Sequence, residues 1–272
     1  MSEILTGYGE IAMLWFDGCG SENHAYDWPR IMAEIRRMQP GILIFNMGDP
    51  DYRWVGNEAG IAPQPCWNTV DAVPVSVRTD ARDTVPHPTW LPAECDCMLR
   101  ATNWFYSDAD THTVKSVAQL LGMYYYSVGR GCNLLLNLGP DRRGLLPDPD
   151  AARIRAFGAE LRRRFSAPFA TLTDCQTLDA GWAYTPPAPT LLDTVVLQEE
   201  LTAGEHIRRF AIAVQPFPYG DPVIVYTGQN IGHKAICAFP PIEATSVRIE
   251  LLEADGPVTL RGVEMYYVAG RE

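Results

Sequence analysis

The sequence predicts a mixed protein in which an α/β part precedes an all-β part. Through residues 1–165, short and wholly apolar runs alternate with amphipathic helical patterns, as expected for parallel strands and the helices that cover them. Through residues 166–272, short β-branched runs alternate apolar and polar positions. That alternation is typical of half-buried antiparallel strands packed as a β-sandwich.

The first strand–helix–strand unit lies at the amino-terminal end. The apolar run 11–16 is followed by Asp17, and residues 42–45 form a second buried run. Between them, Asp27 is placed to cap a helix that Pro40 stops. One strand–helix–strand unit of a parallel sheet is therefore predicted here.

The rest of the first part predicts two more strands and two more helices. Residues 47–92 contain seven prolines and predict a long connection without helices. Strands are predicted at 93–99 and 134–136, and helices at 113–128 and 148–164. Because a closed (β/α)8 barrel of the TIM type takes about 250 residues and eight strands, the four strands predict a partial barrel followed by a sandwich.

Composition excludes several classes of protein. The chain is 47% apolar and 20% charged with a formal net charge of −11, so a core can form and a nucleic-acid partner is disfavoured. No apolar run approaches the roughly 18 residues that cross a bilayer, so no membrane association is predicted. No secretory signal is visible at the start, and localisation stays open.

Neither a metal site nor an organic cofactor is predicted. The seven cysteines are scattered and the five histidines are isolated, whereas zinc sites need closely spaced pairs. Cys95 and Cys97 are expected on one face of a strand as buried free thiols. No phosphate-binding loop, nucleophile elbow or dinucleotide turn is present.

Three carboxyl residues are catalytic candidates. Asp17 directly follows the first strand, where barrel enzymes place catalytic groups, although a turn or helix cap explains that position equally well. Glu58 and Glu94 lie among Trp and Gly residues, although surface glutamate is the simpler interpretation of each. Carboxyls beside indole rings indicate a sugar site, because two carboxyls flanking a glycosidic bond are the usual hydrolytic pair.

Several motifs together resemble the α-L-fucosidases of glycoside hydrolase family 29. The resemblance runs in order through nearly the whole chain. It lies in Ile4-Leu5-Thr6-Gly7-Tyr8-Gly9, Leu14-Trp15-Phe16-Asp17-Gly18, Arg53-Trp54-Val55-Gly56-Asn57-Glu58, Pro92-Ala93-Glu94-Cys95-Asp96, Asn103-Trp104-Phe105-Tyr106, the run from Ser127 to Asn137, and the run from Gly228 to Lys234.

The resemblance implies a catalytic barrel, a galactose-binding-like β-sandwich and hydrolysis of α-L-fucosides with retention. It implies Asp17 as nucleophile and Glu58 as acid/base, with Glu94 as second choice, and no metal or cofactor. The Gly-Asn-Glu form resembles the subgroup that cleaves α-1,3/1,4-fucosyl branches of oligosaccharides or glycoconjugates. The implied substrate-binding residues are Trp15, Arg53, Trp54 and Trp104.

The sequence also departs from the family. Members carry three more barrel strands, which bear histidines that grip fucose, before the position of Asp17. A truncated enzyme, or a half that needs a complement, is therefore expected, with a weak or inactive sugar-binding protein as the alternative. Open strand edges and an inner face bearing Leu14, Phe16, Ile44 and Leu135 predict association as a homodimer or higher homo-oligomer.

Overall fold

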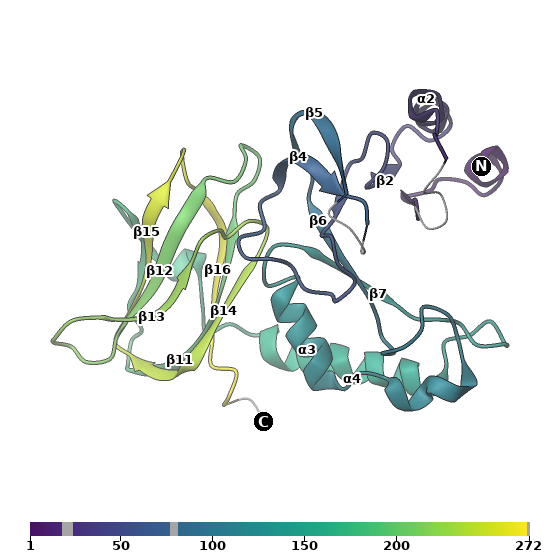
Figure 1. Ribbon diagram of the computed structural model, residues 1–272. Coiled ribbons are helices and arrows are strands. Elements are labelled where there is room, and N and C mark those ends of the chain that lie inside the picture. The colour runs from purple at the N-terminus through teal and green to yellow at the C-terminus, as the bar shows by residue number, and fades with distance from the viewer. Residues whose placement is uncertain (18–23, 77–80, 271–272) are drawn as a thin grey trace.

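The computed structural model describes residues 1–17, 24–76 and 81–270. It shows parallel strands and helices at one end and antiparallel sheets at the other (Figure 1). The helices are α1 (Ser2–Gly7), α2 (Trp28–Met38), α3 (Val117–Tyr126) and α4 (Asp148–Phe165), with short 3-10 helices η1 (Asp108–Thr113) and η2 (Leu172–Asp174). The predicted combination of helices and sheets is confirmed.

Five parallel strands follow one another across the first part. They are β1 (Met13–Trp15), β2 (Leu43–Phe45), β3 (Arg53–Trp54), β6 (Ala93–Met98) and β7 (Asn133–Asn137). β1 pairs with β2, and β3 pairs with β6, which pairs with β7. A parallel bridge between Phe45 and Tyr52 joins the two groups. The strands in the described ranges do not close into a barrel.

Each face of this parallel array has its own lining. Leu14, Phe16 and Ile44 pack with α1 and α2 against Ile35, so the prediction that they line the inner face is wrong. Side chains alternate between the two faces of a strand, so the intervening positions form the other face. Leu135, also predicted for that inner face, is 40% exposed while Leu134 and Leu136 pack toward α3 and α4.

The helices begin and end where their local chemistry dictates. In α2, the Asp27 side chain accepts from the backbone N–H of Arg30, as predicted. α3 is shorter than the predicted 113–128, because Ser116 and Gln119 form a capping box that starts it. Thr113 instead ends the 3-10 helix η1.

The proline-rich connection contains a hairpin that the sequence did not predict. β4 (Thr69–Pro74) and β5 (Arg82–Trp90) pair antiparallel and project from the first part (Figure 1). β5 includes Pro86 and Pro88 within its bounds. Both strands of an isolated hairpin are edge strands. Proline is tolerated in an edge strand, because the position of its missing N–H can face away from the partner strand, where no hydrogen bond of the ladder is lost.

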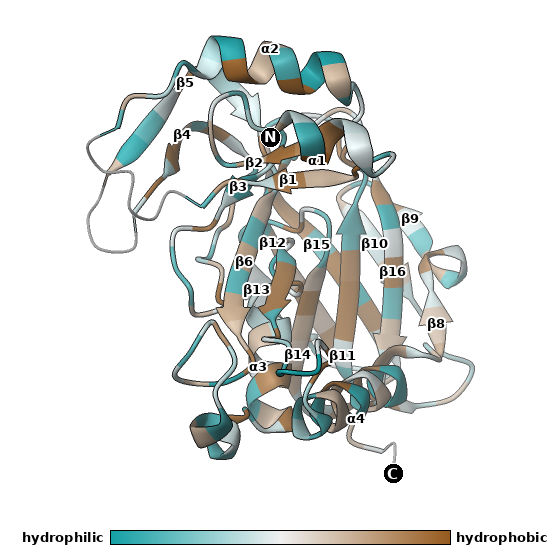
Figure 2. Ribbon diagram, turned by 90° about the vertical axis from the view of Figure 1, so that its right-hand side faces the viewer, coloured by the Kyte–Doolittle hydropathy of each residue, from teal (hydrophilic) through white to brown (hydrophobic). Residues whose placement is uncertain are grey.

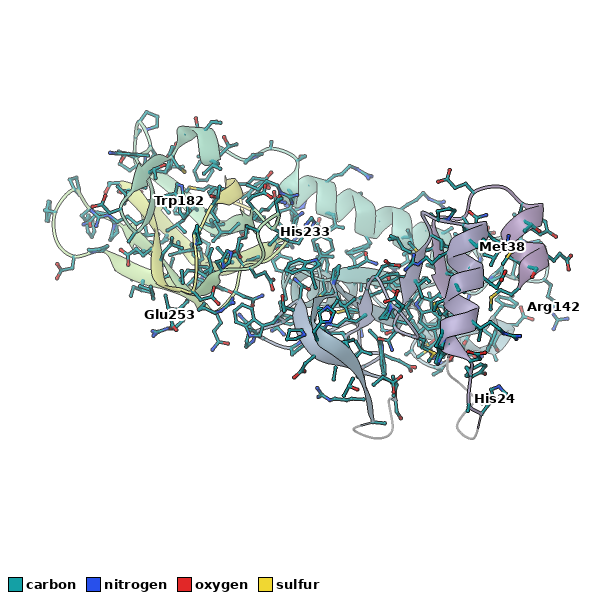
Figure 3. The ribbon with its side chains drawn as sticks, turned by 90° about the horizontal axis from the view of Figure 1, so that it is seen from above. His24, Met38, Arg142, Trp182, His233 and Glu253 are labelled. Atoms are coloured by element: carbon teal, nitrogen blue, oxygen red, sulfur yellow. The ribbon has the colours of Figure 1, made fainter. Side chains whose placement is uncertain are left out.

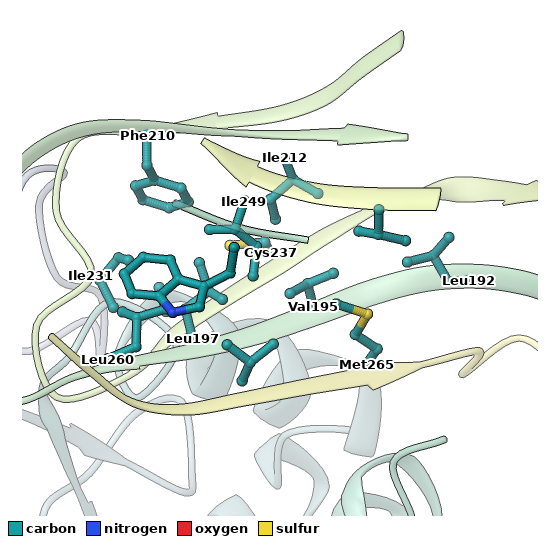
Figure 4. Packing of buried hydrophobic residues seen from close by; sticks show 14 of the residues in the cluster. Leu192, Val195, Leu197, Phe210, Ile212, Ile231, Cys237, Ile249, Leu260 and Met265 are labelled. Carbon is teal, nitrogen blue, oxygen red and sulfur yellow. The ribbon is translucent and has the colours of Figure 1, made fainter. Parts of the chain in front are cut away.

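The second part consists of two antiparallel sheets around one core. One sheet has the order β13-β12-β15-β10-β9 and the other β14-β11-β16-β8. Phe210 and Ile249 of the first sheet meet Val195 and Met265 of the second (Figure 4). The strands are β8 (Ala170–Thr171), β9 (Gln176–Leu178), β10 (Gly181–Tyr184), β11 (Thr190–Glu199), β12 (Ile207–Gln215), β13 (Val223–Gly228), β14 (Ala235–Ala244), β15 (Ser246–Ala254) and β16 (Leu260–Tyr266).

The two parts are joined by an apolar contact and by polar bonds. Phe165 at the end of α4 packs edge-on against Tyr266 of β16, with ring centroids 5.6 Å apart. Glu205 accepts two bonds of 2.9 Å from the backbone and side-chain nitrogens of Asn68. His233 lies near this junction (Figure 3). The division at residues 165 and 166 stays a prediction.

Candidate active site

Asp17 lies just beyond the carboxyl end of β1 and is exposed. Two residues earlier, Trp15 stacks on Phe45 of β2 with ring centroids 4.6 Å apart and planes inclined by 9°. The indole N–H of Trp15 donates to Oε1 of Glu94 at 3.1 Å. The contacts of Trp15 with Phe45 and with Glu94 therefore fix the end of the strand that carries Asp17.

Glu94 is the most constrained of the three predicted carboxyls. Only 1% of its surface is exposed. Oε1 accepts from Trp15, and Oε2 accepts from Nδ2 of Asn133 at 2.7 Å. β1 stands three places from β6 in the array, about 14 Å away in a flat sheet. The Trp15–Glu94 bond therefore shows that the array curls around this face.

Asp96, two residues after Glu94 on β6, also accepts a hydrogen bond from an indole ring. Residues two apart share a face of a strand, and Oδ1 of Asp96 accepts from the indole N–H of Trp54 at 2.5 Å. The pKa of the Asp96 carboxyl is raised to about 6, mainly by burial. The hydrogen bond from Trp54 lowers this pKa, and the negative charges of Glu58 and Glu94 contribute to raising it. Asp96 was not among the predicted site residues, although its spacing from Glu94 is a visible signal.

Glu58 lies in the turn that follows β3 and is exposed. Gly56 enters this turn with φ +100°, and a side chain there would press against the ring of Pro74. The Asn57 side chain shapes the turn by accepting from the N–H of Ala59 at 3.0 Å and donating to the carbonyl of Ile61 at 2.9 Å. The negative charge of Glu58 contributes to the raised pKa of Asp96.

Arg53 and Trp54 point to opposite faces of β3. The Trp54 indole lies on the carboxyl face. The Arg53 guanidinium is buried elsewhere, where it donates to the backbone carbonyls of Trp54 at 3.3 Å and Trp67 at 2.9 Å, and contacts the sulfur of Cys66. The structure therefore does not bring Arg53 together with the three carboxyls.

Trp104 lies in the segment between β6 and η1, beyond the carboxyl ends of the parallel strands. Its ring is half-buried, and its carbonyl accepts from Nδ2 of Asn137, the last residue of β7, at 2.7 Å.

Two neutral polar residues were also missed by sequence reasoning. Asn133 pairs with Glu94 in register, and burial followed by the charge of Glu94 raises the pKa of Tyr52 to about 12.

The buried cysteines take part in packing. Cys95 and Cys97 are free and fully buried, as predicted. Cys19 lies outside the described residues. Within the described ranges, no group of three His, Cys, Asp or Glu residues is placed to hold a metal ion. No helix there is long and apolar enough to span a bilayer.

Carboxyls set among indole rings beside the ends of parallel strands are typical of glycoside hydrolases. Comparison with known proteins agrees, because residues 1–164 match the α-L-fucosidase family model. The chain therefore belongs to the α-L-fucosidase family, glycoside hydrolase family 29.

Individual relatives share the sequence and the fold. α-L-Fucosidase 1 of Arabidopsis thaliana is 36% identical over 61% of this chain and 34% of its own length. A solved structure from Bacteroides thetaiotaomicron, described as that of an α-L-fucosidase, is 31% identical with a TM-score of 0.84, over 98% of this chain and 62% of its own. A glycoside hydrolase 29 family member from an unknown rumen bacterium is 28% identical with a TM-score of 0.86, over 98% of this chain and 52% of its own. The chain thus spans between a third and two thirds of the length of these relatives.

Proposed function

We propose that the protein hydrolyses terminal α-L-fucosyl linkages with retention, using Asp17 as nucleophile and Glu58 as acid/base. Family membership supports the substrate class. The observation that carries the residue assignment is that Asp17 and Glu58 are both exposed at the ends of β1 and β3. In this proposal the sugar rests against Trp15, which is 39% exposed, between the two carboxyls.

The chemistry follows the two-step mechanism of retaining glycosidases. The Asp17 carboxylate attacks the anomeric carbon while Glu58 gives its proton to the departing oxygen. Glu58 then takes a proton from water, which attacks the same carbon, frees fucose and restores the Asp17 carboxylate. The two carboxyls supply every bond-making and proton-transfer step.

Glu58 is favoured over Glu94 as acid/base on geometric grounds. A general acid must reach the leaving oxygen, whereas both oxygens of Glu94 already accept N–H donors and its side chain is buried. Glu94 instead orients Trp15 and, through it, the end of β1. In this proposal Arg53 supports the loop around Trp67 and does not touch the sugar.

Two finer assignments complete the proposal. The Gly56-Asn57-Glu58 form favours α-1,3/1,4-fucosyl branches of oligosaccharides or glycoconjugates as substrates. The parallel array and the paired antiparallel sheets support the proposal of a partial TIM-type barrel with a galactose-binding-like sandwich.

Hydrolysis of an aryl α-L-fucoside tests the assignment. Asp17→Asn is expected to lower kcat on the order of 10⁴-fold, and Glu58→Gln on the order of 10²–10³-fold. Azide, which attacks without a general base, is expected to restore turnover by Glu58→Ala. Glu253→Gln on β15 is the matched control and keeps wild-type activity. Fucose binding without turnover that is indifferent to Asp17→Asn would instead identify a sugar-binding protein.

A further inference from the structure

Asp96 is a buried carboxyl that the proposed reaction does not use. It is 5% exposed and lies on the same face of β6 as Glu94. The indole N–H of Trp54 donates to its Oδ1. One oxygen is therefore held, and the carboxyl is fixed beside the two candidate acid/base residues.

The groups that act most strongly on the Asp96 carboxyl are negative or neutral. The turn after β3 contributes Glu58, β6 contributes Glu94, and β3 contributes the neutral Trp54. On β7, Asp96 faces Leu135 in register, with the neutral side chains of Asn133 and Asn137 two positions away on either side. A negative charge on Asp96 would be buried with neutral N–H donors beside it, which is costly.

We propose that Asp96 takes up and releases a proton in the working pH range and thereby sets the negative charge that stabilises the transition state. The inference rests on the proposed function, because that charge matters for catalysis only if a fucosidic bond is cleaved at this site. When Asp96 carries its proton, its carboxyl is neutral. When Asp96 loses the proton to water, the site gains one negative charge.

The change in charge has a catalytic consequence. The transition state of glycoside hydrolysis resembles an oxocarbenium ion and carries positive charge, which a fixed negative charge stabilises. We therefore expect kcat to rise as Asp96 ionises near pH 6. In Asp96→Asn that rise is absent and kcat above this pH is lower by about tenfold, with KM unchanged.

The protonation of Asp96 can be followed without any turnover. In protein with isotope-labelled tryptophan, the indole N–H signal of Trp54 is identified by its loss in Trp54→Phe. That signal is expected to move in a single step with a midpoint near pH 6. Asp96→Asn abolishes the step, whereas the distant Glu253→Gln (Figure 3) leaves it in place.

Glu58→Gln provides a second measurement that does not alter Asp96. Removing a negative neighbour is expected to lower the midpoint of the Trp54 step. A Trp54 signal that stays flat between about pH 4 and 8, or a step that survives Asp96→Asn, overturns the inference. An active enzyme with a flat signal contradicts this inference alone, whereas a step near pH 6 in a protein without fucosidase activity contradicts the proposed function.

Discussion

At the scale of single residues, the site is built from pairs of one indole and one carboxyl. Trp15 donates to Glu94 and Trp54 donates to Asp96. A neutral indole N–H satisfies an oxygen without adding charge, so each carboxyl is held in place with no positive charge to neutralise it. Ionised carboxyls held in this way suit a reaction in which positive charge develops on a sugar.

Replacement of Glu94 tests its role as a support. Glu94→Gln keeps the shape but presents an amide N–H₂ to one of two N–H donors, Trp15 or Asn133. We expect a loss of about 1–3 kcal/mol in the free energy of unfolding, measured by denaturant titration. We expect azide not to restore the turnover of Glu94→Ala, and restored turnover would move the acid/base role to Glu94.

Asp96 makes stability depend on pH in a defined window. Its pKa is about 6 in the folded protein against an ordinary value of 3.8, so the folded state holds a proton that the unfolded state has released. The stability that this proton provides is complete below about pH 4 and is lost as pH rises to about 6. Relative to Asp96→Asn, the wild type is expected to lose on the order of 2 kcal/mol across this window. Parallel pH curves for the two proteins would contradict this.

At the scale of elements, local signals decide which helices form and where they start. Ser116 and Gln119 close the capping box of α3. Ser116→Ala is expected to cost about 1 kcal/mol of unfolding free energy. Ser166→Ala, at the exposed end of α4, is the matched control and stays within about 0.5 kcal/mol. Equal effects of the two substitutions would contradict a specific role for the cap.

Elements with a strong local pattern could be predicted from the sequence. Helix α2 has its cap at Asp27, and α4 has apolar residues at helical spacing with a basic last turn. The hairpin β4–β5 could not be predicted, because its pairing depends on contacts between strands and its prolines argue against a strand.

Prediction of the site was limited in the same way. The residue types and motifs place Asp17, Glu58 and Glu94 as candidates. However, only the curl of the array shows that Trp15 reaches Glu94, because that bond joins strands distant in the sequence. Burial of Arg53 on the opposite face was equally hidden, since a two-residue strand is too short to show alternation.

At the scale of the whole molecule, the two parts are coupled and one face is open. Phe165 packs against Tyr266, and Asn68 bonds to Glu205, across the junction of the two parts. Within the described residues, helices cover one face of the parallel array, as seen with the α1–α2 layer over β1 and β2 (Figure 2). The sheets and the array are therefore expected to unfold together rather than one after the other.

The open face predicts self-association. Met13, Trp15, Leu43 and Leu135 are exposed there, with Met13 at 50% and Leu43 at 47%. Within the described residues, β1 pairs only with β2 and β7 only with β6, so each offers an edge to a second copy. Light scattering at micromolar concentration is expected to show a dimer or larger species, which Leu43→Asp weakens. A monodisperse species of 30.2 kDa would contradict this expectation.

The most direct test of the central claim is to trap the intermediate. An activated 2-fluoro-α-L-fucoside reacts with the nucleophile of a retaining enzyme, and the fluorine slows release of the sugar by destabilising the positively charged transition state. Mass spectrometry of the digested protein is expected to find one fluorofucosyl group on Asp17, no label in Asp17→Asn, and unchanged labelling of Asp17 in Glu94→Gln. A label on Glu58 or Glu94, or turnover of the reagent by Asp17→Asn, would contradict the assignment of Asp17 as the nucleophile.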